Sequence, residues 1–287
     1  MTNVTQHQDP HRAPGAERVL AIFDLDKTII DTSASLAYRR PMAERGLLNT
    51  GEVLKMMAML GNYMISTHSE DSLESTKDAL TSIIKDRESE PLRQVARDAL
   101  QEVITPFIYA EARELIEWHR NMGHRIAIVT ASASIMVQPI AEELGVDHLF
   151  ATELEEKDGR FTGAVTHFNK GHAKVERIQQ LAHEHGYDLE KSFAYSDAAT
   201  DIPMLELVGN PVAVNPDRPL KKRATESDWP IKQFNRPEPL FPQAAVIAGA
   251  GATLALLGIA ATGLALWWRG REAVSYTHLR AHETSLH

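Results

Sequence analysis

Short apolar runs alternate with stretches of helical periodicity along most of the chain. Four runs of mainly apolar residues are typical of strands buried on both faces of a sheet, and they cover 19–23, 125–129, 192–195 and 211–215. Apolar positions three and four apart predict helices between these runs, over 110–121, 135–144, 175–185 and 202–208. Strands that alternate with helices favour an α/β fold with a parallel sheet.

Two regions depart from this alternation. Residues 148–154 and 161–168 are predicted strands on either side of the tight turn Lys157-Asp158-Gly159-Arg160, which indicates a hairpin. Residues 33–108 contain helical patterns and no convincing strand. We therefore expect a helical cap at 33–108, inserted after the first strand of a core made of 19–32 and 109–229.

The two ends of the chain differ from the core in composition. Residues 1–18 are polar and lack the apolar run of a signal peptide, so we expect a disordered leader and a catalytic domain in the cytoplasm. Residues 230–243 are rich in proline and predict a stiff linker. Residues 244–268 carry no charge and would form a helix of about 37 Å, longer than the roughly 30 Å of bilayer hydrocarbon. We expect a single-pass transmembrane helix whose orientation is open, because basic residues flank both ends.

The last stretch fits no element. The segment VSYTHLRAHET within the tail 269–287 resembles the translated adaptor sequence found at the ends of some conceptual translations. We expect residues 274–287 to be a sequencing artefact and assign them no function.

Composition excludes several classes of function. The net charge of −9 argues against a nucleic acid partner. The absence of cysteine excludes disulfides, zinc–cysteine sites and cysteine nucleophiles.

Polar residues gather where the predicted strands end. Asp24 and Asp26 follow the first strand, Thr130-Ala131-Ser132 follows the second, and Asp197 and Asp201 follow the strand 192–195. Lys174 lies at the start of the helix 175–185, where a cation is unfavourable for the helix dipole. Taken singly, these residues could be turns, helix caps and a solvated lysine. In a parallel sheet, however, such strand ends meet at one edge, where ligands bind.

Four motifs, in this order, resemble those of the haloacid dehalogenase superfamily, in the branch similar to phosphoserine phosphatase. They are FDLDKT, VTAS, a lysine at 174 or 170, and YSDAATD. The resemblance covers about residues 19 to 230 and extends to a membrane-linked group of hydrolases through EARELIEWHRNMGH, DGRFTG and DIPMLELVGNPVAVNPD. It implies a Rossmann-like core with a small helical cap.

The resemblance also assigns roles around a phosphate ester. Asp24 would attack the phosphorus and form an aspartyl-phosphate, and Asp26 would exchange protons with the leaving group and the attacking water. Mg²⁺ would be bound by Asp24, Asp197 and Asp26, the last through its backbone carbonyl.

The remaining motif residues would hold the phosphoryl group. Lys174 and Thr130, with the N–H groups near Ala131 and Ser132, would bind its oxygens. Asp201 would orient Lys174 or a metal-bound water.

The resulting hypothesis is a Mg²⁺-dependent phosphomonoesterase, held at the membrane, that acts on a small phosphorylated metabolite or a lipid head group. Phosphoserine is an alternative, although Ser33 stands where the resemblance expects a glutamate and residues 67–85 contain no arginine. A second alternative, of another class, is a catalytically weak, membrane-tethered regulatory protein that binds phosphate. The oligomeric state stays open.

Overall fold

The structure is a computed structural model, and it describes residues 18–49, 51–52, 81 and 84–235. Most of the predicted leader, the middle of the predicted cap, the linker beyond 235, the apolar segment 244–268 and the tail lie outside the described residues. Among the residues that are described, no helix is both long enough and apolar enough to cross a bilayer.

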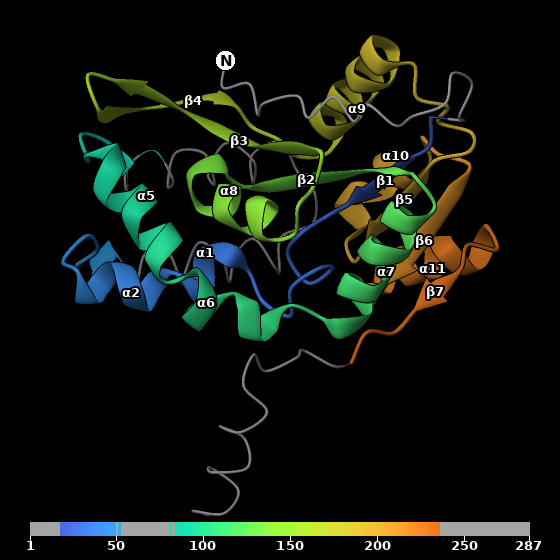
Figure 1. Cartoon of the computed structure of the whole chain (residues 1–287), viewed down its shortest axis with the longest axis horizontal. Coiled ribbons are helices and arrows are strands. Elements are labelled where there is room, and N and C mark those ends of the chain that lie inside the picture. Colours follow the sequence, from blue (N-terminus) through green and yellow to red (C-terminus); the bar gives the residue numbers. More distant parts are fainter. Residues whose placement is uncertain (1–17, 50, 53–80, 82–83, 236–287) are drawn as a thin grey trace, which may run out of the picture. The chain divides into compact units, whose positions relative to one another are not determined.

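The described residues form a seven-stranded sheet in the order β4-β3-β2-β1-β5-β6-β7 (Figure 1). Every neighbouring pair is parallel except β3 and β4, so the predicted α/β architecture with a mostly parallel sheet is confirmed. The strands are β1 (Leu20–Phe23), β2 (Arg125–Ala133), β3 (His148–Lys157), β4 (Arg160–His167), β5 (Phe193–Ser196), β6 (Asn210–Val214) and β7 (Ile231–Lys232).

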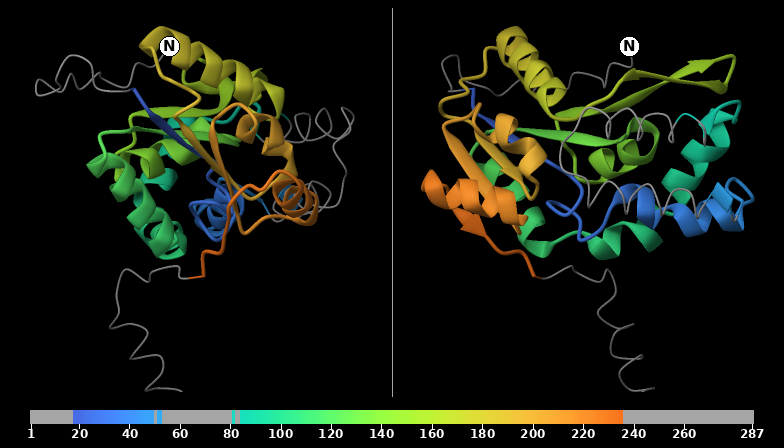
Figure 2. Two further views of the ribbon diagram at one scale, coloured as in Figure 1. Left: turned by 90° about the vertical axis from the view of Figure 1, so that its right-hand side faces the viewer. Right: turned by 180° about the vertical axis from the view of Figure 1, so that it is seen from behind.

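The helices divide between the two faces of the sheet because the side chains of each buried strand alternate. Ala21 and Phe23 of β1 belong to a core with α7 (Ala110–Asn121) and α8 (Ser134–Glu143). Leu20 and Ile22 belong to a second core on the opposite face. That core includes α9 (His172–His185), α10 (Ile202–Leu205) and α11 (Arg218–Glu226). Figures 1 and 2 show the helices on the two sides of the sheet.

β1 is the central strand, and the chain changes direction around it. The first connection leads from β1 to β2 on one side, whereas the segment after β4 runs through α9 to β5 on the other side. Such a reversal opens a crevice at the carboxyl end of the central strand. Asp24 lies at that end.

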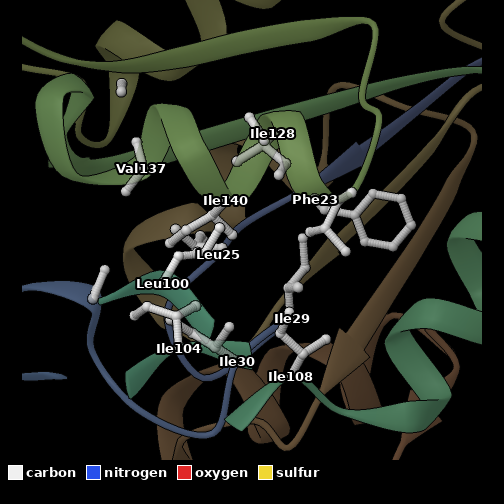
Figure 3. Close-up of a cluster of buried hydrophobic side chains, with 14 of the residues drawn as sticks. Phe23, Leu25, Ile29, Ile30, Leu100, Ile104, Ile108, Ile128, Val137 and Ile140 are labelled. Atoms are coloured by element: carbon white, nitrogen blue, oxygen red, sulfur yellow. The ribbon is translucent and has the colours of Figure 1, made fainter. Parts of the chain in front are cut away.

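The base of the inserted helices shares the core of the sheet. The insertion includes α1 (Ala34–Ala37), α2 (Arg39–Glu44), α5 (Ser89–Asp98), α6 (Leu100–Val103) and the 3-10 helix η1 (Thr105–Phe107). Figure 3 shows one buried cluster that joins β1, β2 and α8 to this base; it contains Phe23, Leu25, Ile29, Ile30, Leu100, Ile104, Ile108, Ile128, Val137 and Ile140. The predicted boundary of the cap therefore crosses a continuous hydrophobic core.

The predicted hairpin is present, and it anchors the insertion. Asp158 and Gly159 form its turn with φ of 52° and 76°, as a tight two-residue connection requires. The backbone of the insertion bonds to the hairpin tip, from Ser89 N to Gly159 O over 2.9 Å and from Phe161 N to Arg87 O over 2.9 Å. The insertion is thus tied to the core at two places, its base and this tip.

One predicted boundary is wrong. The linker was predicted to begin at 230, yet β7 pairs with β6 and Phe234 is buried against Tyr109, with 5.8 Å between the ring centroids. Asn215 holds the Phe234 backbone through two hydrogen bonds, one to its oxygen and one from its nitrogen. Both side chains of β7 are exposed, so this strand leaves no hydrophobic pattern in the sequence.

Candidate active site

Asp24 is the first residue after β1, and it is buried. Its backbone N–H donates to Tyr195 O over 2.9 Å, so the ladder with β5 continues past the end of the strand. The chain then turns sharply, with the N–H groups of Ile29 and Ile30 donating to Leu25 O. Lys27, within this turn, has a φ of 61°. The turn places two carboxylates, those of Asp24 and Asp26, at the carboxyl edge of the sheet.

Lys174, in the first turn of α9, lies against the Asp24 carboxylate. Its Nζ donates to Asp24 Oδ1 over 2.7 Å and to Asp201 Oδ2 over 2.8 Å, and its side chain is 3% exposed. Lys170, the other lysine considered from the sequence, is half-buried, and burial lowers its pKa to about 8. The hydrogen bond of Lys174 places its ammonium group directly against Asp24.

Asp201 joins Lys174 to the end of β5. Its Oδ2 also accepts a hydrogen bond from Ser196 Oγ over 2.8 Å. Its Oδ1 is buried and has no hydrogen-bond partner among the described residues. Ser196 was not predicted as a site residue, although its place directly before Asp197 in the fourth motif was a usable signal.

Asp26 is held by two hydrogen bonds, one to each carboxylate oxygen. The Ala34 N–H donates to Oδ1 over 2.7 Å, and Ser132 Oγ donates to Oδ2 over 2.7 Å. The sequence predicts that Ser132 lies at the phosphate site, and the structure adds that its hydroxyl donates to Asp26. Because both oxygens already accept hydrogen bonds, the backbone carbonyl is the group of Asp26 best suited to bind a cation.

Thr130, Ala131 and Ser132 belong to β2, which extends four residues beyond its predicted end. The pairing of β2 with β3 is irregular there, between Val129 and Ala133. Thr130 is fully buried, and its Oγ1 accepts a hydrogen bond from Ser132 N over 3.1 Å. The hydroxyl proton of Thr130 can therefore be donated to another acceptor.

Asp197 is half-buried and is braced from α11. The Asp217 N–H donates to Asp197 O over 2.8 Å, and Asp217 Oδ2 accepts from Ala199 N over 3.0 Å. Thr28 Oγ1 lies 3.4 Å from Asp197 Oδ1, which connects the first and fourth motifs. Asp217 was missed at the sequence level, because an aspartate before a helix also fits an ordinary cap, which it provides for Leu220 N.

The buried charges shift one another's pKa. Burial raises the pKa of Asp24 to about 7 against the attraction of Lys174, and the charges of Asp201 and Asp26 add to the rise. Burial and then the charge of Asp24 raise the pKa of Asp197 well above its usual range. Burial would lower the pKa of Lys174, but Asp201 and Asp24 outweigh it and raise that pKa. The site therefore holds more carboxylate than Lys174 alone neutralises.

A hard divalent cation fits this excess of oxygen ligands. No three acidic or histidine side chains of the described part form a metal cluster by themselves. Asp24 and Asp197 provide two carboxylates, and the charge of Asp24 opposes the ionisation of Asp197. The Asp26 carbonyl can be the third protein ligand. Mg²⁺ accepts such a set because it retains several waters and needs only one or two carboxylates.

Comparison with known proteins shows similarity to a family of hydrolases and to several phosphatases. A model of the haloacid dehalogenase-like hydrolase family matches residues 21–206. A probable phosphatase of Mycobacterium tuberculosis is 38% identical over 284 residues, which are 96% of this chain and 95% of that protein. The histidinol-phosphatase of Neisseria meningitidis is 31% identical over 223 residues, covering 75% of this chain and 98% of its own. A crystal structure of apo phosphoserine phosphatase has a TM-score of 0.56 at 25% identity, over 77% of this chain and 96% of that one.

Proposed function

The chain belongs to the haloacid dehalogenase-like hydrolases, and from this premise we propose that it hydrolyses small phosphate monoesters through an aspartyl-phosphate at Asp24. Membership of the family confirms the superfamily that the four motifs indicated, and two of the similar proteins are named as phosphatases. The observation that carries the proposed mechanism is the buried contact of Lys174 with both Asp24 and Asp201.

In the first step, an oxygen of ionised Asp24 attacks phosphorus, and the bond from phosphorus to the ester oxygen breaks. Lys174 Nζ lies 2.7 Å from Asp24 Oδ1, close enough to neutralise the oxygens of the phosphoryl group as it arrives. Asp201 keeps the ammonium group in place through its own contact of 2.8 Å. The Thr130 hydroxyl provides a second donor at the same edge of the sheet.

Asp26 carries the protons. Its carboxyl group gives a proton to the departing alkoxide and then takes one from the water that attacks the aspartyl-phosphate. The hydrogen bonds from Ala34 N and Ser132 Oγ hold both of its oxygens during the exchange. The second step releases inorganic phosphate and restores Asp24 as a carboxylate, so atoms and charge balance over the cycle.

Mg²⁺ is the cofactor that we propose, held by Asp24, Asp197 and the Asp26 carbonyl. When bound, it supplies positive charge beside the phosphoryl oxygens and allows both carboxylates to stay ionised. Asp217 keeps Asp197 in place because its N–H donates to Asp197 O and its carboxylate accepts from Ala199 N.

For the substrate, we propose a small phosphorylated metabolite or a phosphorylated lipid head group. Phosphoserine is the second candidate, favoured by the likeness to a phosphoserine phosphatase structure. Two of the similar phosphatases are named for histidinol phosphate and phosphoserine, which are both phosphate esters of small molecules that carry an amine. Ser33 stands where the resemblance expects a glutamate that would bind the amine of phosphoserine, which argues against phosphoserine as the substrate.

We also propose that residues 244–268 anchor the enzyme in a membrane as a single helix, with the catalytic domain in the cytoplasm. The support is the uncharged composition of this segment and the Trp267-Trp268 pair followed by basic residues. Fractionation of cells that express the full chain or a chain ending at residue 238 tests the anchor. Recovery of the full chain in the soluble fraction without detergent would exclude it.

Steady-state hydrolysis of p-nitrophenyl phosphate tests the proposed reaction. We expect turnover that requires Mg²⁺ and falls by about three orders of magnitude in Asp24→Asn, where the nucleophile is lost. Turnover that survives this substitution would exclude the mechanism. A protein that binds phosphate without any turnover would favour the regulatory alternative.

A further inference from the structure

Two buried polar side chains near the site have no part in the chemistry proposed above. Asn169, in the loop before α9, and Thr152, in β3, are both fully buried. We propose that they are positioning residues, which hold the phosphate-binding turn Thr130–Ser132 in register with Lys174. This inference rests on the proposed function and adds to it a set of residues outside the four motifs.

The turn needs support because the β2–β3 ladder fails there. Val129 pairs with Phe150 and Ala133 pairs with Thr152, so the three residues 130–132 of β2 face the single residue 151 of β3. Two extra residues on one strand disrupt the ladder and push the chain out of it. Buried backbone carbonyls that lose a strand partner need another donor.

Asn169 and Thr152 are the donors. Asn169 Nδ2 donates to Thr130 O over 3.0 Å and to Phe150 O over 2.9 Å. Thr152 Oγ1 donates to Ala131 O over 2.7 Å and accepts from Asn169 N over 3.2 Å. The two side chains thus form one connected network that satisfies two carbonyls of the irregular stretch, those of Thr130 and Ala131.

Fixing these carbonyls also fixes the groups that face a phosphate. In a trans peptide the N–H points away from the carbonyl, so holding Thr130 O turns Ala131 N–H to the opposite side. Ser132 N then meets Thr130 Oγ1, which sets the direction in which the Thr130 hydroxyl can donate. A shift of about 1 Å in such donors is enough to reduce turnover by roughly a hundredfold.

The network of Asn169 and Thr152 also lies beside the start of α9, the helix that carries Lys174. Asn169 precedes Gly171, whose φ is 58° and whose carbonyl accepts from Lys174 N over 3.1 Å in the first turn of α9. The residue that holds the Thr130 carbonyl therefore also fixes the start of the helix that carries Lys174. The carboxylates of Asp24 and Asp197 follow β1 and β5 and lie outside this network. A mutation in the network should therefore weaken phosphate binding and leave Mg²⁺ binding unchanged.

The test compares Thr152→Val, which keeps the shape and deletes the hydroxyl, with Thr152→Ser, which keeps the hydroxyl, both in the full chain. For Thr152→Val we expect kcat to fall by ten- to a hundredfold and inhibition by inorganic phosphate to weaken about tenfold. The Mg²⁺ concentration for half-maximal activity should stay unchanged, and Thr152→Ser should behave as wild type. Asn169→Ser, which deletes the amide, provides a second variant with the same expected direction.

A purely structural role would give a different result. It would lower the melting temperature and the folded fraction while leaving KM and the phosphate inhibition constant of the folded enzyme unchanged, and that outcome would overturn the inference. Equal constants for Thr152→Val and Thr152→Ser would also overturn it. If wild-type protein shows no turnover, the proposed function fails; calorimetric titration with inorganic phosphate then decides the inference separately, and equal affinities for the two variants reject it.

Discussion

Ser132 Oγ donates a hydrogen bond to Asp26 Oδ2 over 2.7 Å, between residues 106 positions apart in the chain. Together with the Ala34 N–H on the other oxygen, it fixes the carboxylate that we propose as acid and base. Burial raises the pKa of Asp26, and these two donors oppose the rise because they favour the ionised form. Ser132, from the second motif, thus lowers the pKa of Asp26, the proposed proton-transfer residue of the first motif.

Ser132→Ala should raise the pKa of Asp26, because one donor to its charged form is lost. In the second step Asp26 must be ionised to take a proton from water, so the acidic limb of the rate of aspartyl-phosphate hydrolysis should move to higher pH. Ser132→Thr, which keeps a hydroxyl, is the control and should retain the wild-type profile. A pH–rate series for both variants checks this, and superimposed acidic limbs for alanine and wild type would contradict it.

Lys174→Met should abolish turnover and destabilise the fold. Two buried carboxylates, Asp24 and Asp201, would lose their shared cation, and breaking a buried pair on one side costs about 3–5 kcal/mol. Lys170→Met is the matched control, since the Lys174 contacts remain; we expect a smaller loss of both activity and unfolding free energy. Urea denaturation measures the unfolding free energies of the two variants. Equal losses of stability and activity would contradict the proposed role of Lys174.

Mg²⁺ binding should depend on pH through Asp24. Its pKa of about 7 in the metal-free site means that a proton occupies the carboxyl group at lower pH and must be displaced by the metal. The apparent affinity for Mg²⁺ should therefore rise by about tenfold or more per pH unit up to about pH 7, because protons on Asp24 and on Asp197 both oppose the metal. Titration of activity with Mg²⁺ from pH 5.5 to 8.5 measures this, and a constant half-saturation point would refute it.

His119 should make the free energy of unfolding decrease as the pH falls. It is fully buried, with Nε2 2.9 Å from the Tyr195 hydroxyl, and burial followed by the charge of His124 lowers its pKa from 6.5 to about 3. Between these values the unfolded chain binds the proton and the folded chain does not, so acid favours unfolding. Through this residue, the free energy of unfolding should decrease by up to about 1.4 kcal/mol for each pH unit below 6.5.

The contribution of His119 is isolated by comparing wild type with His119→Gln. The unfolding free energy of the variant should fall less steeply between pH 6.5 and 5, because the group that titrates is gone. Parallel curves for the two proteins would show that His119 is not kept neutral by the fold.

The strand ends were predictable because two simple rules place them. Buried parallel strands are continuous apolar runs, and their carboxyl ends share one edge, so pattern and topology predicted that Asp24 and Asp201 lie close together. The candidate lysines, 174 and 170, depended on the family resemblance. The hairpin followed from Asp158-Gly159, since these residues accept positive φ. These features depend on local chemistry or on a repeated pattern.

The supporting residues were not predictable, because each is a single polar residue whose partner is distant in sequence. Asn169 reaches a carbonyl 39 positions away, and Asp217 reaches Ala199 from the cap of α11. The hydroxyl of Ser132 could have faced either a phosphate or a carboxylate, and only the packed structure selects Asp26. The end of the core at Phe234 was hidden for a similar reason, since the preceding β7 exposes both of its side chains.

The central claim is that the Asp24 carboxylate becomes covalently phosphorylated during turnover. Rapid acid quench of the full-length enzyme during hydrolysis, followed by peptide mass spectrometry, tests it most directly. We predict one phosphoryl group on the peptide that carries Asp24, lost in Asp24→Asn and sensitive to hydroxylamine as an acyl phosphate is. Active enzyme that yields no adduct on this peptide, or an adduct on another residue, would contradict the account.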